Sequence, residues 1–440
     1  MKDCVQKVNY ENKSTQSKKS PKVIKKTVQS FLSEDVGGAQ RYLKGAMRIK
    51  LNKKNQKYLE RIMLLQLLGE LYGLHTLHGI IDVLGIKSSK IHQLWRKYES
   101  ITILNKACSV FDNLLSERLI ALGKCGESTW SRANVCIVED GSIFKQWLTQ
   151  EEFGKCYARY FSGQTHKTEY GFHVVLIGVC IGEEFYPYRF KLIDYSQKGH
   201  LKKVSCDLLN KCASFMEGIR KKHDLVFGKI YVSVDSGFRD ERFLRQCEVH
   251  GFESIVSCVK SHTFEIGQYK GNLSTYIEQV YKTKEQAYIA ECERLGEDAA
   301  AFTLRVKAYY KAMKREVLLV FFRVNESKKI SVVMTTDQAA KRKTIRRRFF
   351  QRVKIEQFFR FVKHVLCIQQ STSKNTLGMM RKIAVFFVKA VLLQRLTRKI
   401  RRTHEFFKKM GFERIRRQFC LSCSTDELDE LFNKATFCRT

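Results

Sequence analysis

Apolar residues recur along the chain in two patterns, and each pattern predicts one kind of secondary structure. Residues 31–125 carry apolar side chains at helical spacing, as in Tyr58 and Ile62, which predicts helices. From residue 134 the pattern changes to short runs rich in Val, Ile, Tyr and Phe, which are typical of strands. From Arg346 onward the spacing is helical again, nearly to the end of the chain.

The middle region combines strands and helices in an order that indicates a mixed sheet. The predicted strands are 134–140, 171–181, 185–194, 229–235, 254–260, 317–324 and 330–334. Helical spacing occurs between the third and fourth of these strands (200–222) and between the fourth and fifth (239–250). We therefore expect an α/β fold with a ribonuclease H-like mixed-sheet core, flanked by helical N-terminal and C-terminal regions.

Composition and charge narrow the class of partner. The chain of 440 residues is 44% hydrophobic and 12% aromatic, which is too apolar for a disordered chain. Its 80 Lys and Arg residues outnumber its 44 Asp and Glu residues, for a net charge of +36. Such an excess indicates a polyanionic partner, either nucleic acid or an anionic membrane surface. We expect no membrane insertion, because the most apolar stretch, Ile383–Leu393, is about half of the roughly 20 residues that span a bilayer.

The cysteines and the N-terminus indicate the compartment. Fifteen cysteines without the spacing of a secreted scaffold favour reduced thiols and a cytoplasmic protein. Residues 1–30 are Lys-rich and carry no apolar signal-peptide region. Cys420 and Cys423 form a single CxxC pair, whereas a structural zinc site has four ligands. Packed or exposed thiols are the favoured interpretation, and zinc remains the alternative.

Two aspartates close predicted strands. Asp140 ends NVCIVED and Asp235 ends KIYVSVD. Ligands of open α/β sheets gather where parallel strands end, and two carboxylates there can hold Mg²⁺. The alternative for each is a local hydrogen bond that shapes a turn before Gly or Ser. For Asp194, before Tyr195-Ser196, the turn is the favoured interpretation.

A basic segment carries one isolated acid. Residues 341–360 contain nine Lys or Arg and a single carboxylate, Glu356. Phe349, Arg352, Glu356 and Lys363 are separated by 3, 4 and 7 residues, which predicts that they share one helical face. Cations beside a metal-binding acid suit a phosphodiester backbone. The alternative is a solvated helix held by Glu–Arg and Glu–Lys ion pairs.

At these residues the sequence resembles a known family. The pattern Phe349-x2-Arg352-x3-Glu356-x6-Lys363 is similar to the Y-x2-R-x3-E-x6-K signature of DDE transposases of the insertion-sequence-4 type. Phe349 departs from the signature because it lacks the tyrosine hydroxyl. The resemblance implies that Arg352, Lys363 and Phe349 contact DNA.

The two aspartates extend the resemblance. Asp140 in VEDGS and Asp235 in VDSGF match the first two acids of the family. With Glu356 they are implied to be the catalytic residues and to hold two Mg²⁺ ions, for which Mn²⁺ can substitute. The implied activity is metal-dependent cutting of transposon ends and joining of those ends to target DNA.

The resemblance also implies the partners and the setting. The partners are the inverted-repeat DNA of a mobile insertion sequence, target DNA, and a second copy of the chain in a homodimeric DNA complex. A small-molecule substrate and a membrane are not expected. The location is the cytoplasm of a prokaryote, in association with the nucleoid.

A second DNA-binding signal lies in the N-terminal region. Residues 77–96 place apolar side chains and Gly85 as a helix-turn-helix requires. Its second helix would present Lys90, Gln93 and Arg96 to a DNA groove. The alternative is an ordinary helical hairpin.

The expected organisation has six segments. They are a flexible basic arm (1–30), a helical DNA-binding region (31–130), a first core part (134–264), an insertion domain (265–335), a second core part (340–400) and a helical tail (401–440). Two other functions remain open beside the transposase. One is a structure-selective DNA nuclease on the same core, and the other is a DNA-binding protein that has lost its chemistry.

Overall fold

The computed structural model describes residues 100–145, 156–162, 166–238, 241–295, 302–323, 330–368, 376–403, 408 and 411–415. These residues divide between two units. The sheet unit contains the described residues of 111–361 and 376–380, and the helical unit contains the others. The predicted arm, the predicted helix-turn-helix with Lys90, Gln93 and Arg96, and the Cys420/Cys423 pair lie outside the described residues.

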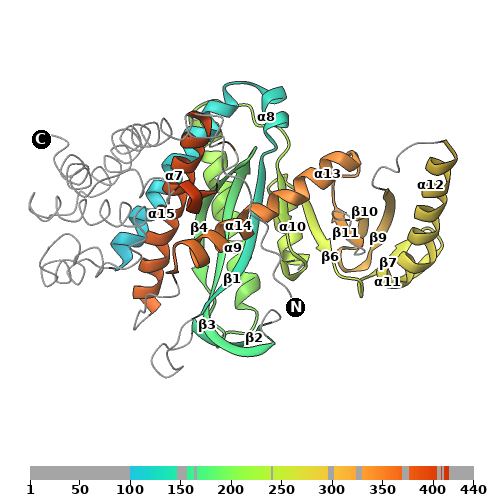
Figure 1. Cartoon of the computed structure of the whole chain (residues 1–440), viewed down its shortest axis with the longest axis horizontal. Coiled ribbons are helices and arrows are strands. Elements are labelled where there is room, and N and C mark those ends of the chain that lie inside the picture. The colour runs from blue at the N-terminus through green and yellow to red at the C-terminus, as the bar shows by residue number, and fades with distance from the viewer. Residues whose placement is uncertain are drawn as a thin grey trace, which may run out of the picture. The chain divides into compact units, whose positions relative to one another are not determined.

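One mixed sheet of eleven strands organises the sheet unit. Its order is β2-β3-β1-β5-β6-β11-β10-β9-β7-β8, and β4 also pairs with β3 (Figure 1). The strands are β1 (Cys136–Lys145), β2 (Tyr157–Ser162), β3 (Lys167–Ile181), β4 (Glu184–Leu192), β5 (Tyr231–Val234), β6 (Glu253–Cys258), β7 (Thr263–Ile266), β8 (Tyr269–Asn272), β9 (Thr303–Tyr310), β10 (Arg315–Arg323) and β11 (Ile330–Thr335).

Helices connect and cover these strands. The α-helices are α7 (Ser100–Gly123), α8 (Glu127–Ala133), α9 (His200–Lys222), α10 (Glu241–Val249), α11 (Leu273–Tyr276), α12 (Lys282–Leu295), α13 (Arg342–Phe349), α14 (Val353–Arg360) and α15 (Thr376–Thr403). Short 3₁₀ turns are η4 (Ser236–Phe238), η6 (Lys311–Met313) and η7 (Phe350–Arg352), and π turns are η5 (Ile277–Tyr281) and η8 (Phe361–Val365).

Strand directions confirm the predicted mixed α/β sheet. β1 is antiparallel to β3 and parallel to β5, which is parallel to β6. β4 is antiparallel to β3 and therefore runs in the same direction as β1. Parallel neighbours need a crossover connection, which is usually helical. Helix α9 connects β4 to β5, and α10 connects β5 to β6.

The predicted elements of this region largely match the observed ones. The helix predicted at 200–222 is α9, with the same bounds, and the helix predicted at 239–250 contains α10. The strand predicted at 134–140 is too short, because β1 continues to Lys145 along its antiparallel partner β3. The sequence pattern does not predict strands β2, β7, β8 and β9.

The two faces of the central strands pack against different helices. On one face, Ile137, Val175 and Val232 join apolar side chains of α7, α9 and α10 in one core cluster. The opposite face packs against α13, η7 and α14. There Phe144 of β1 contacts Phe359 of α14 at a centroid distance of 6.1 Å. Because side chains alternate along a strand, neighbours on β1 belong to different cores.

Residues 263–335 extend the sheet beyond β6. β11 pairs antiparallel with β6, and β10, β9 and β7 follow it outward. Helix α12 lies beyond them at the end of the sheet in Figure 1. The segment predicted as an insertion domain, 265–335, falls within this extension, and its separate role stays a prediction.

The described helical unit consists of the first part of α7, most of η8, most of α15 and a short helix near residue 412. The apolar stretch Ile383–Leu393 lies within α15, and all of its residues are buried. Among the described residues, each helix is too short or too polar to cross a membrane.

Candidate active site

Strand register brings the two predicted aspartates together. β1 and β5 pair in parallel from Cys136 opposite Tyr231 to Glu139 opposite Val234. The next residue on each strand is an aspartate, so Asp140 and Asp235 follow the last pair of the parallel ladder. Asp140 is not at the end of its strand as predicted, because β1 continues along β3. It lies instead where β5 leaves the side of β1.

The backbone after Asp140 is held closely. The N–H of Gly141 donates to Oδ1 of Asp140 at 2.8 Å. A Cβ at position 141 would lie 2.4 Å from Nε2 of His173 on β3, so only glycine fits there without displacing the imidazole. Nδ1 of His173 lies 2.8 Å from the hydroxyl of Tyr195, in the turn that precedes α9. The aspartate strand and that turn are therefore joined through one imidazole.

The third acid stands on the helix that covers the aspartate face. Nη1 of Arg352 lies 2.8 Å from Oε1 of Glu356 and 3.7 Å from Oδ2 of Asp140. The Asp140, Arg352 and Glu356 side chains are 16%, 17% and 31% exposed. The structure thus brings three predicted site residues together, with the guanidinium between two carboxylates. The Glu–Arg pair expected of a solvated helix is present, but it faces the strand aspartate.

The carboxyl of Asp140 has a raised pKa. Burial raises the pKa of its carboxyl from 3.8 to about 6. The positive charge of Arg352 and the Gly141 N–H offset part of this rise, whereas the negative charges of Glu356 and Asp235 add to it. The three acids therefore interact, and the charges of the other two contribute to the raised pKa of Asp140.

The donor set fits a hard divalent cation in its chemistry, since three carboxylates are the oxygen ligands that Mg²⁺ favours. Within the described part of the chain, however, no three Asp, Glu, His or Cys side chains are gathered closely enough to hold one metal ion. Arg352 occupies the space between Asp140 and Glu356. Metal binding would require these side chains to rearrange around Arg352.

The Phe349 side chain is buried and not exposed to solvent. Its side chain is 9% exposed, and its ring lies edge-on to Phe322 at 6.0 Å and to Phe350 at 5.7 Å. The guanidinium carbon of Arg352 lies 6.0 Å from the ring centroid. In this arrangement the Phe349 ring packs beside the Arg352 guanidinium. A DNA contact through the ring stays a prediction.

The basic helix is not one continuous α-helix. The 3₁₀ turn η7 separates α13 from α14, and the π turn η8 follows α14. Three residues make one turn of a 3₁₀ helix, which keeps Phe349 and Arg352 on the same side. Lys363 lies in η8 and belongs to the helical unit, so its predicted role near the acids stays a prediction.

Glu139 is an acid that the sequence did not single out. It precedes Asp140 but points to the opposite face, where its side chain is 0% exposed. Among the described residues, neither carboxylate oxygen has a partner at hydrogen-bond geometry. Burial raises its pKa well above 4.5, and the nearby Ser205 hydroxyl offsets only part of this rise. Burial thus favours the protonated form of Glu139, and its side chain belongs to the core on the α9 face.

A second site missed from the sequence is a basic groove between α9 and α10. It has a volume of about 790 Å³ and is lined by Gln197, Lys198, Gly199, His200, Lys202, Lys203, Glu241, Arg242, Arg245, Gln246 and Val249. The turn beside it contains Asp194, which accepts hydrogen bonds from Ser196 and Gln197. The predicted turn role of Asp194 is confirmed.

Compared with models of known protein families and with curated proteins, the sequence matches none of them. The chemistry of the site therefore has to be judged from the arrangement of its own residues.

Proposed function

We propose that the chain is a DDE-type DNA transposase, which cuts DNA and joins the resulting 3′-hydroxyl ends to target DNA. The observation that supports this most directly is the register of β1 and β5, which sets Asp140 beside Asp235. Glu356 acts on Asp140 from the helix over the same face. Three interacting carboxylates beside an arginine suit phosphoryl transfer better than they suit a purely structural cluster.

The topology supports the ribonuclease H-like part of the proposal. Strands β1, β3 and β4 are consecutive antiparallel neighbours, and β5 and β6 are added in parallel through the helices α9 and α10. This is the order of elements expected for such a core. Helix α14, with the third acid, then returns to the aspartate face.

Each residue has a proposed role. Asp140, Asp235 and Glu356 hold the divalent ions, which when bound activate the attacking oxygen and stabilise the leaving oxygen. Arg352 offers a planar fork of N–H donors that suits two oxygens of one phosphate. When DNA is bound, we expect the guanidinium to exchange a carboxylate for the phosphate. The acids are then released to face the cations.

The proposed reaction balances in two steps. In the first, a water oxygen bonds to the phosphorus and the bond to the 3′ oxygen breaks, which leaves a 3′-hydroxyl and a 5′-phosphate. In the second, that 3′ oxygen bonds to a phosphorus of target DNA, and the target's own 3′ oxygen leaves. One proton is released from each attacking oxygen, and each leaving oxygen takes one up.

The test uses the full chain with plasmid DNA that carries the sequences flanking its coding region. With Mg²⁺ or Mn²⁺ we expect nicking, and joining of a labelled 3′-hydroxyl end to plasmid. Asp140→Asn, Asp235→Asn and Glu356→Gln should each reduce both products to background while DNA binding remains. Full activity in any one of these variants would remove that residue from the site.

Glu139→Gln is the matched control. It changes the neighbouring acid on the opposite face, which is buried away from the three acids, so we expect cleavage and joining to stay near the wild-type rate. Nicking without joining would contradict the transposase and favour the nuclease. Binding without either product, in the wild-type chain, would favour the DNA-binding protein without chemistry.

A further inference from the structure

The basic groove between α9 and α10 opens at the same edge of the sheet as the acids. β4 and β5 run in the same direction as β1, and α9 and α10 follow them in the chain. Both helices therefore begin at the edge where Asp235 follows β5. The Tyr195–His173 contact holds the turn before α9 against β3, where the His173 ring lies close to Gly141 of β1.

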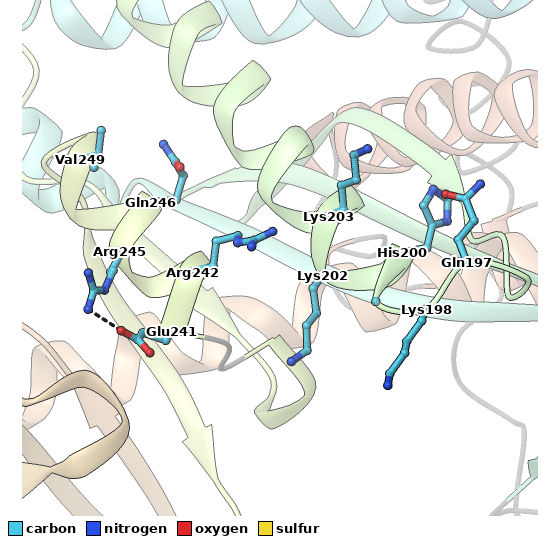
Figure 2. Close-up of a pocket in the computed structure, with 11 residues that line it drawn as sticks. Gln197, Lys198, His200, Lys202, Lys203, Glu241, Arg242, Arg245, Gln246 and Val249 are labelled. Carbon is cyan, nitrogen blue, oxygen red and sulfur yellow. Dashed lines mark ion pairs between the residues drawn. The ribbon is translucent and has the colours of Figure 1, made fainter.

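The lining of this groove is strongly cationic. Figure 2 shows the lysines on the α9 side and the arginines on α10. Five cationic side chains line it against one carboxylate, Glu241, which pairs with Arg245 at 2.5 Å. Nδ1 of His200 accepts a hydrogen bond from the Asp194 N–H at 2.8 Å, which ties the first residue of α9 to the turn before it. The cationic residues are Lys198, Lys202, Lys203, Arg242 and Arg245.

The start of α9 adds to the positive potential. Gly199 has φ 75°, in the left-handed region that glycine adopts readily, and it turns the chain into the helix. Within the described part of the chain, no side chain caps α9, and its first turn contains no acid. The positive end of the helix dipole is therefore not offset by a carboxylate of its own helix.

We propose that this groove binds the phosphodiester backbone of DNA, as a second track beside the three acids. The acids lie on the α14 face of the sheet and the groove on the α9 face, and both reach the same edge. A duplex laid across that edge can place one phosphate at the acids and others between α9 and α10. Most of the side chains that line the groove are charged or polar, which suits repeated phosphates better than a small apolar ligand.

The inference rests on the proposed function only for the identity of the polyanion, so binding is measured without chemistry. The full chain is titrated with a labelled DNA duplex in EDTA, over a series of KCl concentrations. Lys202→Gln/Lys203→Gln should lower the slope of log Kd against log salt by roughly 0.9 for each phosphate that the variant no longer binds. Arg242→Gln, on the opposite wall, should lower it by a similar amount for one phosphate.

The same helix supplies the matched control. Lys221→Gln/Lys222→Gln removes two charges from the other end of α9, at the far edge of the sheet. We expect its slope and Kd to remain close to those of the wild-type chain. If the groove variants and this control give the same slope, the proposal is overturned, since only overall charge then matters.

Four further outcomes test the proposal. If the wild-type chain binds pyrophosphate at matched ionic strength, the groove variants do not, and the duplex stays bound in both, the groove is a small-anion pocket and the proposal fails. If an RNA duplex binds in the groove and DNA does not, it also fails. If the groove variants lower the salt slope but the wild-type chain cuts no DNA, the transposase proposal is wrong and the groove proposal stands. If the wild-type chain cuts DNA with a divalent metal and the groove variants leave the slope unchanged, the groove proposal is wrong and the transposase proposal stands.

Discussion

The two edges of the central sheet carry acids in opposite electrostatic settings. At the edge where β5 ends, the pKa of Asp140 is raised, and two further acids add to the rise. At the edge where β5 begins, Asp337 accepts a hydrogen bond from the Tyr231 hydroxyl at 2.5 Å and pairs with Lys229 at 3.1 Å. Burial opposes ionisation there too, but these partners outweigh it and hold the pKa of Asp337 below 3.8.

Helix α9 repeats the difference between its two ends. Near its C-terminal end, Glu217 pairs with Arg220 at 2.7 Å and with Lys221 at 3.5 Å. At its start, Lys202 and Lys203 line a groove that is rich in cations and contains one carboxylate, from α10. One edge thus sets opposite charges against each other, which stabilises the fold. At the other edge, Asp140 and Glu356 share one arginine on one face, and cations outnumber acids in the groove on the other face.

The largest expected effect is on stability at the internally paired edge. Asp337→Ala removes the acceptor of a buried Tyr231 hydroxyl and the partner of Lys229. We expect the free energy of unfolding to fall by about 3 kcal/mol, because a polar group without its partner is costly. Urea unfolding measures it, and DNA cleavage per folded molecule should not change. Glu217→Ala, in an exposed pair, should have no measurable effect on the free energy of unfolding. An equal loss of stability in Asp337→Ala and Glu217→Ala would contradict the special role given to the buried pairing of Asp337.

The next effect is on rate at the acid edge. Arg352→Ala removes the guanidinium between Asp140 and Glu356. If it positions the phosphate, cleavage should slow about 100-fold, which is about 2.7 kcal/mol in barrier height. Arg352→Lys should restore little, since a point charge does not replace a planar fork. Single-turnover cleavage measures the rate. A wild-type rate in Arg352→Ala would show that Arg352 forms a structural salt bridge with Glu356 and does not position the phosphate.

A third prediction concerns pH and metal at Asp140. Its pKa in the folded chain, about 6, lies above 3.8. The folded chain therefore keeps a proton that the unfolded chain loses between these pH values, and stability falls as pH rises from about 4 to 6. Asp140→Asn should raise the free energy of unfolding at pH 7.5, without divalent ions, by on the order of 2 kcal/mol. At pH 4 it should have little effect.

The same variant tests the metal. Added Mg²⁺ should raise the unfolding temperature of the wild-type chain, because a ligand that binds only the folded state stabilises it. The Asp140→Asn chain should respond much less. A gain in stability that is equal at pH 4 and pH 7.5 would show that it does not come from the raised pKa of Asp140. An equal response of both chains to Mg²⁺ would show that Asp140 is not a ligand of the ion.

The sequence is most informative where local pattern decides structure. Helix α9 is predicted with its observed bounds because its apolar residues follow one helical period over the whole element. The pattern ends a strand at Asp140 because Gly141-Ser142 resembles a turn. Pairing with β3, which is remote in sequence, keeps the strand extended beyond it. Strand β9, TLRVKAYY, escapes prediction although Arg305 and Lys307 alternate with apolar residues as in a half-buried strand, because this alternation extends over only a few residues.

The site is predictable in part for the same reason. Spacing along one helix finds Arg352 and Glu356, and the strand motifs find both aspartates. The groove between α9 and α10 depends on strand order, which brings residues about 40 positions apart to one edge. Helical spacing alone also places Phe349 beside Arg352 on a shared face. It does not indicate that β10 covers this face with Phe322.

The smallest expected effect is at Phe349, the position that departs from the tyrosine of the family signature. Its ring is enclosed by Phe322 and Phe350 and lies under the Arg352 guanidinium. Phe349→Tyr keeps this aromatic contact and adds one hydroxyl. We therefore expect the free energy of unfolding to change by less than about 1 kcal/mol, and the cleavage rate to stay near that of the wild-type chain. Phe349→Leu, which removes the aromatic face, should slow cleavage more than the tyrosine does, because Arg352 loses its cation–π support. Cleavage and urea unfolding of both variants separate packing from chemistry. If Phe349→Tyr instead raises the cleavage rate strongly, the hydroxyl itself contacts the substrate, and the ring is not only a support for the arginine.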